Sequence, residues 1–165
     1  MSFWTAKTFE IIMGIFDFLS GSSSRGKSTN PMADMYRGLI EPQKYSIMGV
    51  LFFFQGFSLG NTNANEANKM VYFMASALEV EIPEAMAFAE RRLNTGDKLV
   101  RGLQTIKDRA ILDSVLYNCF GLAKISHKDE AFAAMIELFK EVGYTENEIF
   151  NTVQKIDALG KMFNR

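Results

Sequence analysis

The stretch GSSSRGKST begins at Gly21 and matches the phosphate-loop pattern G-x-x-x-x-G-K-[ST] through Ser28. In a nucleotide-binding protein, such a loop follows a buried strand and opens a helix whose N–H groups face the phosphates. Here Pro31 would take the fifth position of that helix, where it lacks an N–H and clashes with the carbonyl of Lys27. We therefore predict a flexible linker over residues 21–31, and nucleotide binding is the least favoured function.

The single cysteine, Cys119, and the single histidine, His127, are the residues best suited to nucleophilic catalysis. Such catalysis needs a base beside the nucleophile and a third group that orients the base. No supporting motif surrounds either residue, so we interpret Cys119 as a small buried hydrophobe and His127 as an exposed loop residue. We predict no catalytic residue and no cofactor. One cysteine also forbids an internal disulfide, which favours a reducing, cytoplasmic location.

The loop GNTNANE, from Gly60 to Glu66, is rich in side-chain oxygens and resembles a cation site. It carries one carboxylate, however, whereas a calcium loop uses several. Asn61 and Asn63 are also favourable turn and helix-cap residues. Capping is therefore the favoured role, no metal site is predicted, and weak cation binding by Asn61, Asn63 and Glu66 stays open.

The composition limits which fold classes and which classes of binding partner are expected. The chain has 165 residues, of which 48% are hydrophobic and 22% are charged, with a formal net charge of −1. This is an ordinary globular balance that allows one domain with a sizeable core. The near-zero charge implies no bulk attraction to nucleic acid or to anionic lipid. Only three prolines are present, and alternating apolar–polar runs are few, so helices are favoured over strands.

Helix signals recur along the whole chain. Three capping signatures, Asn63-x-x-Glu66, Ser126-x-x-Asp129 and Thr145-x-x-Glu148, each place an oxygen and a carboxylate over unpaired N–H groups. The expected helices cover residues 3–19, 33–39, 42–59, 63–78, 83–93, 95–106, 108–124, 126–142 and a last segment from 145. We therefore predict an all-α bundle of about seven or eight helices.

A shift of 64 residues reveals an internal repeat. Under this shift Glu66 falls on Glu130, and Val80 falls on Tyr144. Each copy contains an apolar helix, a short polar loop, a capped helix, a turn and another capped helix. The pattern predicts a pseudo-twofold relation within the bundle.

The chain divides into three expected regions: an amphipathic arm at 1–20, the linker at 21–31 and the bundle at 32–165. The arm has a broad apolar face but only one basic residue, so docking on a protein or a second copy is favoured over a membrane. Its candidate contact residues are Trp4, Phe9, Ile12 and Ile15. The segment lacks a basic region and a small-residue cleavage site, so no signal peptide is expected. Met13 is an alternative start of translation.

Two segments of opposite charge complete the candidate surfaces. Residues 90–109 are basic and residues 126–150 are acidic. The basic residues predicted to bind a partner are Arg91, Arg92, Lys98 and Arg101. Aromatic residues do not interleave with them, so nucleic acid is not the expected partner. The simplest interpretation is that both segments form solvated faces, with an ion pair between Asp97 and Arg101. The functional interpretation is that together they form a polarised surface that binds a protein.

The two loops resemble those of the TerB-like family, helical domains named for a tellurite-resistance protein. That family repeats roughly A-D-G-x-[IV]-s-x-x-E before an apolar helix that ends in L-G. The corresponding segments here are SLGNTNANE, Ser58 to Glu66, and LAKISHKDE, Leu122 to Glu130. The family's loop aspartate is replaced by Leu59, and the second copy has no Asp-Gly, so the resemblance implies degenerate metal loops. It also implies a cytoplasmic helical adaptor in a stress or defence system.

We therefore expect a non-enzymatic module that acts through contact with a protein partner or with itself. The alternative is a small inhibitor or immunity-type protein that blocks an enzyme.

Overall fold

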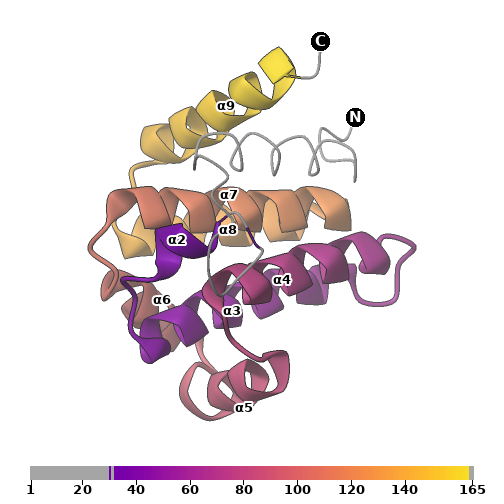
Figure 1. The fold of residues 1–165 in the computed structure, drawn as a ribbon. Coiled ribbons are helices and arrows are strands. Elements are labelled where there is room, and N and C mark those ends of the chain that lie inside the picture. Colours follow the sequence, from indigo (N-terminus) through magenta and orange to yellow (C-terminus); the bar gives the residue numbers. More distant parts are fainter. Residues whose placement is uncertain (1–29, 31, 164–165) are drawn as a thin grey trace.

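The computed structural model describes residue 30 and residues 32–163 of the chain (Figure 1). This part contains eight α-helices, one 3-10 helix and no strand. The elements are α2 (Ala33–Tyr36), α3 (Glu41–Gln55), η1 (Gly56–Ser58), α4 (Ala64–Leu78), α5 (Ile82–Arg92), α6 (Gly96–Gln104), α7 (Arg109–Ser126), α8 (Asp129–Val142) and α9 (Glu146–Phe163). The predicted all-α bundle is confirmed, while the arm, and the linker apart from Asn30, lie outside the described residues.

Several helices begin with the expected capping chemistry. The Thr145 N–H donates to the Glu148 carboxylate over 2.9 Å, and the Glu148 N–H donates to the Thr145 hydroxyl over 3.1 Å. This reciprocal pair is the capping box that the sequence predicts for α9. The Thr95 hydroxyl likewise caps α6, and the Asp108 carboxylate caps α7. The short range of these bonds explains why sequence spacing alone could locate the helix starts.

Two of the expected caps are wrong in detail. Asn63 precedes α4, yet its side chain makes no cap and donates instead to the carbonyl of Ile125, over 3.0 Å. Ser126 ends α7 rather than opening α8, because its hydroxyl donates to the Ala123 carbonyl over 2.6 Å. Both side chains stabilise the C-terminal end of α7, where carbonyl groups lack helical partners.

The internal repeat appears in how the helices end. At the end of α4, Glu79 has a φ of 58°, and the Val80 N–H donates to a carbonyl five residues back over 3.0 Å. At the end of α8, Gly143 has a φ of 133°, and the Tyr144 N–H makes the same kind of bond over 2.9 Å. These two Schellman-type ends lie 64 residues apart, as the predicted shift requires.

Two strongly apolar helices, α3 and α7, form the centre of the bundle. α3 packs against α4, α5, α6 and α7, whereas α7 packs against α4, α8 and α9. In Figure 1, α5 and α9 lie at opposite ends of the view, with these central helices between them. A buried hydrogen bond of 2.7 Å between the hydroxyls of Tyr36 and Ser114 ties α2 to α7. The burial of most of α3 confirms the central place that its nearly uniform apolar sequence predicts.

Glycine lets α3 and α6 approach closely. A Cβ atom built on Gly102 of α6 would lie 2.4 Å from the Ser46 Oγ and 2.9 Å from its Cβ. One on Gly49 of α3 would lie 2.7 Å from a methyl group of Leu93. At Gly102 the clash includes the Ser46 Cβ, which cannot rotate away, so glycine is required there by contact; at Gly49 the close atom is the end of the flexible Leu93 side chain.

We predict that Gly102→Ala destabilises the fold. Alanine gains roughly 1 kcal/mol of helix propensity over glycine, but overpacking costs about 1–3 kcal/mol, so the free energy of unfolding should fall. Chemical denaturation measures this change. Gly56→Ala is the matched control, since nothing lies within 4 Å of a Cβ there and no loss is expected. Combining Ser46→Gly with Gly102→Ala should recover part of the loss, and a purely additive double variant would contradict the contact.

Candidate functional site

An open groove of about 590 Å³ lies where α3, α5, α6 and α8 meet. Its apolar lining comes from Gly49, Phe52, Phe53, Ala89, Leu93, Leu99, Ala134 and Leu138. Its polar lining comes from Glu90, Asn94, Thr95, Glu137 and Glu141. Phe53 is 46% exposed, although it sits in the most apolar helix of the chain. The groove therefore offers apolar side chains to solvent beside carboxylates, which suits a segment that is itself amphipathic.

The turn between α5 and α6 builds one wall of the groove. α5 ends where the Leu93 N–H donates to the Ala89 carbonyl over 2.9 Å, and Leu93 then packs on Gly49 of α3. The Thr95 hydroxyl caps the start of α6 by accepting a hydrogen bond from the Lys98 N–H. The Lys98 ammonium reaches back to the Asn94 side chain over 2.9 Å. Local hydrogen bonds thus fix the turn that holds Leu93 at the floor.

α8 builds the opposite wall. Its groove residues are Ala134, Glu137, Leu138 and Glu141, spaced i, i+3, i+4 and i+7 along one helical face. The Gln104 side chain at the end of α6 donates to the backbone carbonyl of Glu141 over 3.1 Å and ties the two helices together. A stripe that mixes small, apolar and acidic residues therefore faces the groove from a fixed helix.

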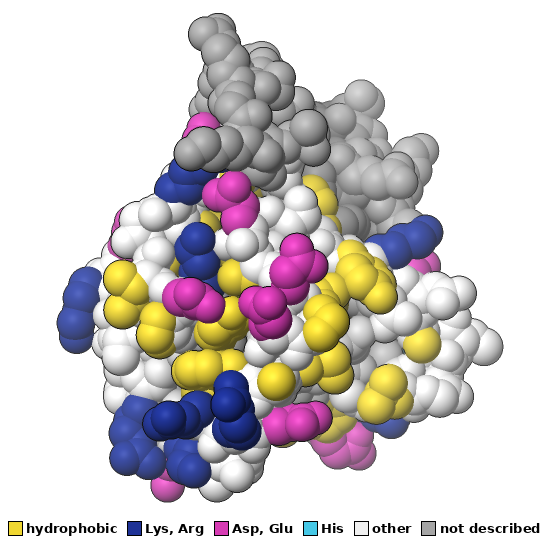
Figure 2. Space-filling view, turned by 60° about the horizontal axis from the view of Figure 1, so that its bottom comes forward, with side chains coloured by type: hydrophobic (Ala, Val, Ile, Leu, Met, Phe, Trp, Pro, Cys, Tyr) yellow, Lys and Arg dark blue, Asp and Glu magenta, His cyan; other side chains and the backbone are white. Residues whose placement is uncertain are grey.

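The structure brings the two charged segments of the sequence to neighbouring surfaces, because α6 packs against α8. The four basic candidates are exposed or nearly so on α5 and α6, but they do not line the groove. Figure 2 brings the α5 end forward and shows Lys and Arg along one border, with acidic and hydrophobic side chains beside them. The predicted Asp97–Arg101 ion pair is replaced by a bond from the Arg101 Nε to the Asp97 carbonyl over 3.3 Å.

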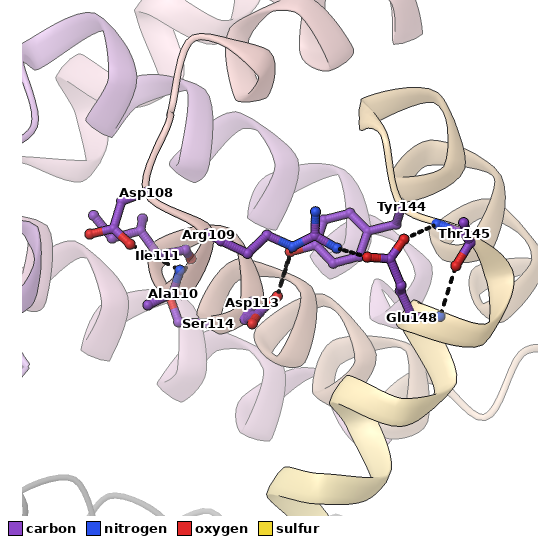
Figure 3. Close-up of polar contacts among 9 residues, drawn as sticks. All are labelled: Asp108, Arg109, Ala110, Ile111, Asp113, Ser114, Tyr144, Thr145 and Glu148. Atoms are coloured by element: carbon purple, nitrogen blue, oxygen red, sulfur yellow. Dashed lines mark hydrogen bonds and ion pairs between the residues drawn. The ribbon is translucent and has the colours of Figure 1, made fainter.

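A second polar cluster joins the starts of α7 and α9 (Figure 3). The Arg109 guanidinium lies 3.6 Å from the centre of the Tyr144 ring, 2.9 Å from the Glu148 carboxylate and 3.5 Å from that of Asp113. The Tyr144 hydroxyl donates to Asp113 over 2.6 Å. The side chains of Arg109, Asp113, Tyr144, Thr145 and Glu148 each bond to another member of this cluster, so its arrangement is that of a structural clamp.

The environment of the clamp shifts two pKa values. Burial, followed by the hydrogen bond to Asp113, raises the pKa of the Tyr144 hydroxyl well above its ordinary value. The hydrogen bonds with Thr145, the backbone bond first, and then the Arg109 guanidinium hold the pKa of the Glu148 carboxyl below its ordinary value. Each shift favours the protonation state in which the cluster is fully bonded at neutral pH.

The structure does not bring together Cys119 and His127, the two residues best suited to nucleophilic catalysis. Cys119 is fully buried in α7, and burial raises the pKa of its thiol well above the usual range. His127 is exposed at the end of the same helix, with a left-handed φ of 56°. Eight residues of helix separate them by about 12 Å along the axis, which is too far for a proton transfer between their side chains.

In the loop that resembles a cation site, the Asn61 and Asn63 side chains are hydrogen-bonded to backbone groups of the protein. The Asn61 carbonyl oxygen of the side chain accepts from the Asn63 N–H over 2.8 Å, and the Asn63 amide binds Ile125 as described above. Within residues 32–158, no group of three or more acidic, histidine or cysteine side chains is placed to hold a metal ion. This loop therefore joins the first repeat to the end of α7.

The groove acids Glu90, Glu137 and Glu141 were not among the residues that the sequence singled out. For Glu137 and Glu141, the i, i+3, i+4, i+7 spacing with Ala134 and Leu138 was the available signal, but the same pattern describes any amphipathic helix. The predicted contact residues Trp4, Phe9, Ile12 and Ile15 and the phosphate-loop pattern Gly21–Ser28 lie outside the described residues. Among the helices that the structure describes, none combines the length and apolar character needed to cross a bilayer.

We predict that Asn63→Asp destabilises the protein. A carboxylate can only accept hydrogen bonds, so it would face the Ile125 carbonyl without a donor, at a cost of about 1–3 kcal/mol. If Asn63 acted as the helix cap that its sequence position suggests, Asp would instead be neutral or stabilising. Thermal unfolding of this variant, with exposed Asn65→Asp in the first turn of α4 as control, measures the difference.

We also predict that Glu148 makes stability depend on acid pH. Its pKa is lower in the folded state, so its contribution is complete above the unfolded pKa and is lost as the pH falls through the folded value. The melting temperature of the wild type should therefore fall toward that of Glu148→Gln between about pH 7 and about pH 3. Gln keeps the capping geometry, so the comparison isolates the charge. A constant gap across this range would contradict the prediction, and Glu146→Gln controls for net charge.

No protein-family model, no curated protein and no solved structure matches this chain. The resemblance of its loops to the TerB-like family therefore stays a prediction.

Proposed function

We propose that the chain is a non-enzymatic protein-interaction module that binds a protein segment in the groove between α3, α5, α6 and α8. The observation that carries the proposal is an open, largely apolar groove with carboxylates on its walls. A helix or extended segment with an apolar face buries that face in such a groove and leaves its polar side to solvent.

The chemistry of the groove favours a protein over the other classes of ligand. A nucleic acid would bring phosphates beside Glu90, Glu137 and Glu141, where like charges repel. A small metabolite usually binds in a pocket that encloses most of its surface, whereas this groove is open. Exposed aromatic side chains such as Phe53 are typical anchors of protein interfaces.

The finer parts of the proposal rest on the sequence. The resemblance to TerB-like domains supports a cytoplasmic adaptor that serves a stress or defence system. The arm at residues 1–20 would supply a second protein contact through Trp4, Phe9, Ile12 and Ile15. The described chain begins beside α4, where the Asn30 side chain donates to the Phe73 carbonyl over 3.0 Å. Groove variants and a chain without residues 1–20 test the two proposed contacts one at a time.

We predict that Phe53→Gln reduces capture of the partner about tenfold, because truncating a central aromatic anchor commonly costs this much or more. Quantitative mass spectrometry of proteins captured from a lysate of the source organism measures the loss. Tyr72→Gln is the matched control, because Tyr72 is 64% exposed on α4 and does not line the groove.

Both variants must unfold at temperatures close to that of the wild type for the comparison to hold. Equal capture by the wild type and both variants would refute the groove as the binding surface. A chain that lacks residues 1–20 distinguishes a partner held by the arm, whose capture would be lost with the arm and kept in Phe53→Gln.

A further inference from the structure

All formal charges that line the groove are negative. They belong to Glu90 at the end of α5 and to Glu137 and Glu141 on α8. Within residues 32–158, no ion pair joins any of these three carboxylates to a cation. The nearby basic residues Arg91 and Arg101 instead direct their Nε groups to backbone carbonyls of their own helices. The Lys98 ammonium binds the Asn94 side chain on the α6 side of the groove, so the negative charge is concentrated along α8.

The positions of the two α8 acids are unfavourable for the helix itself. Glu137 and Glu141 lie one turn apart, where like charges repel. Glu141 also lies in the last turn, where the helix dipole disfavours an acid. A basic group placed beside both carboxylates would relieve this repulsion.

We infer that the groove binds a short amphipathic α-helix that carries Lys or Arg along the edge facing α8. This inference rests on the proposed function and names the chemistry of the partner. The apolar face of the helix would contact Phe53, Leu93 and Leu138, all of which line the groove. Basic residues three or four positions apart on its edge would match the single-turn spacing of Glu137 and Glu141.

The dimensions agree with a segment of this size. Eight residues of α8, from Ala134 to Glu141, span about 10 Å, or two turns of a helix. A partner helix of two to three turns would therefore contact the whole wall through residues at i, i+3 or i+4, and i+7.

Charge argues against the chain's own arm as the occupant. The apolar face of residues 3–19 would suit the floor, but its polar side has one base, Lys7, against two acids, Glu10 and Asp17. The same count holds for the arm of a second copy. Both would place more like than unlike charge beside the groove acids, so a separate basic helix is the better match.

The test is a display selection against the full-length protein from a library of amphipathic helical peptides whose polar positions are randomised. Peptides enriched by the wild type should carry Lys or Arg on one edge of the apolar face. Their affinity should fall about tenfold for Glu137→Gln combined with Glu141→Gln, because each exposed pair contributes modestly. The combination of Glu130→Gln with Glu146→Gln removes the same charge elsewhere and should leave affinity unchanged.

The outcomes separate the inference from the proposed function. Enriched peptides that lose binding in Phe53→Gln but are neutral or acidic, or are insensitive to Glu137→Gln with Glu141→Gln, would overturn the inference and keep the groove. Peptides that bind Phe53→Gln as tightly as wild type, or no enrichment at all, would overturn both. Arm-like acidic peptides as winners would assign the groove to residues 3–19 of this chain or of a second copy.

Discussion

Ser46 and Gly102 bring α3 and α6 so close together that a methyl group has no room between them. Because α6 is held there, the turn before it places Leu93 directly on Gly49, and the end of α6 reaches the backbone of Glu141 on α8. The floor and both walls of the groove therefore depend on one tight helix contact. Such contacts are stiff, since a close-packed interior cannot shift by a methyl group without strain.

The two repeats share their design but differ at the point where function is proposed. The first repeat ends in a short helix, α5, whose end turns directly into α6, whereas the second ends in the longer α9. The clamp formed by Arg109, Tyr144 and Glu148 fixes the start of α9 against α7. The corresponding position of Glu148 in the first repeat is Glu84, and the turn around α6 opens the groove on that side instead. The extra helix between the repeats thus breaks their equivalence and creates the surface.

Sequence reasoning located what is determined by near neighbours. The Thr145–Glu148 box, the Thr95 cap and the start of α7 at Asp108 all depend on residues within four positions of one another. The prediction of a cap at Asn63 was wrong because its side chain binds the carbonyl of Ile125, 62 residues away in sequence. The groove was beyond reach for the same reason, because Phe53, Leu93 and Leu138 come together only after three helices have packed. The sequence identified one basic and one acidic segment, but only the packing of α6 against α8 shows that the two segments lie side by side.

In the proposed complex, affinity and specificity would come from different parts of the groove. Buried apolar surface contributes about 25 cal/mol per Å², so contact with Phe53, Leu93 and Leu138 would supply most of the binding free energy. Exposed ion pairs contribute roughly 0–1 kcal/mol each and weaken further with salt. Glu137 and Glu141 would therefore add about tenfold to the affinity, a smaller share than that of the apolar floor. A helix that entered with its basic edge away from α8 would lose the pairs with Glu137 and Glu141 and bring its own acids toward them, so charge would fix the orientation that the apolar floor leaves free.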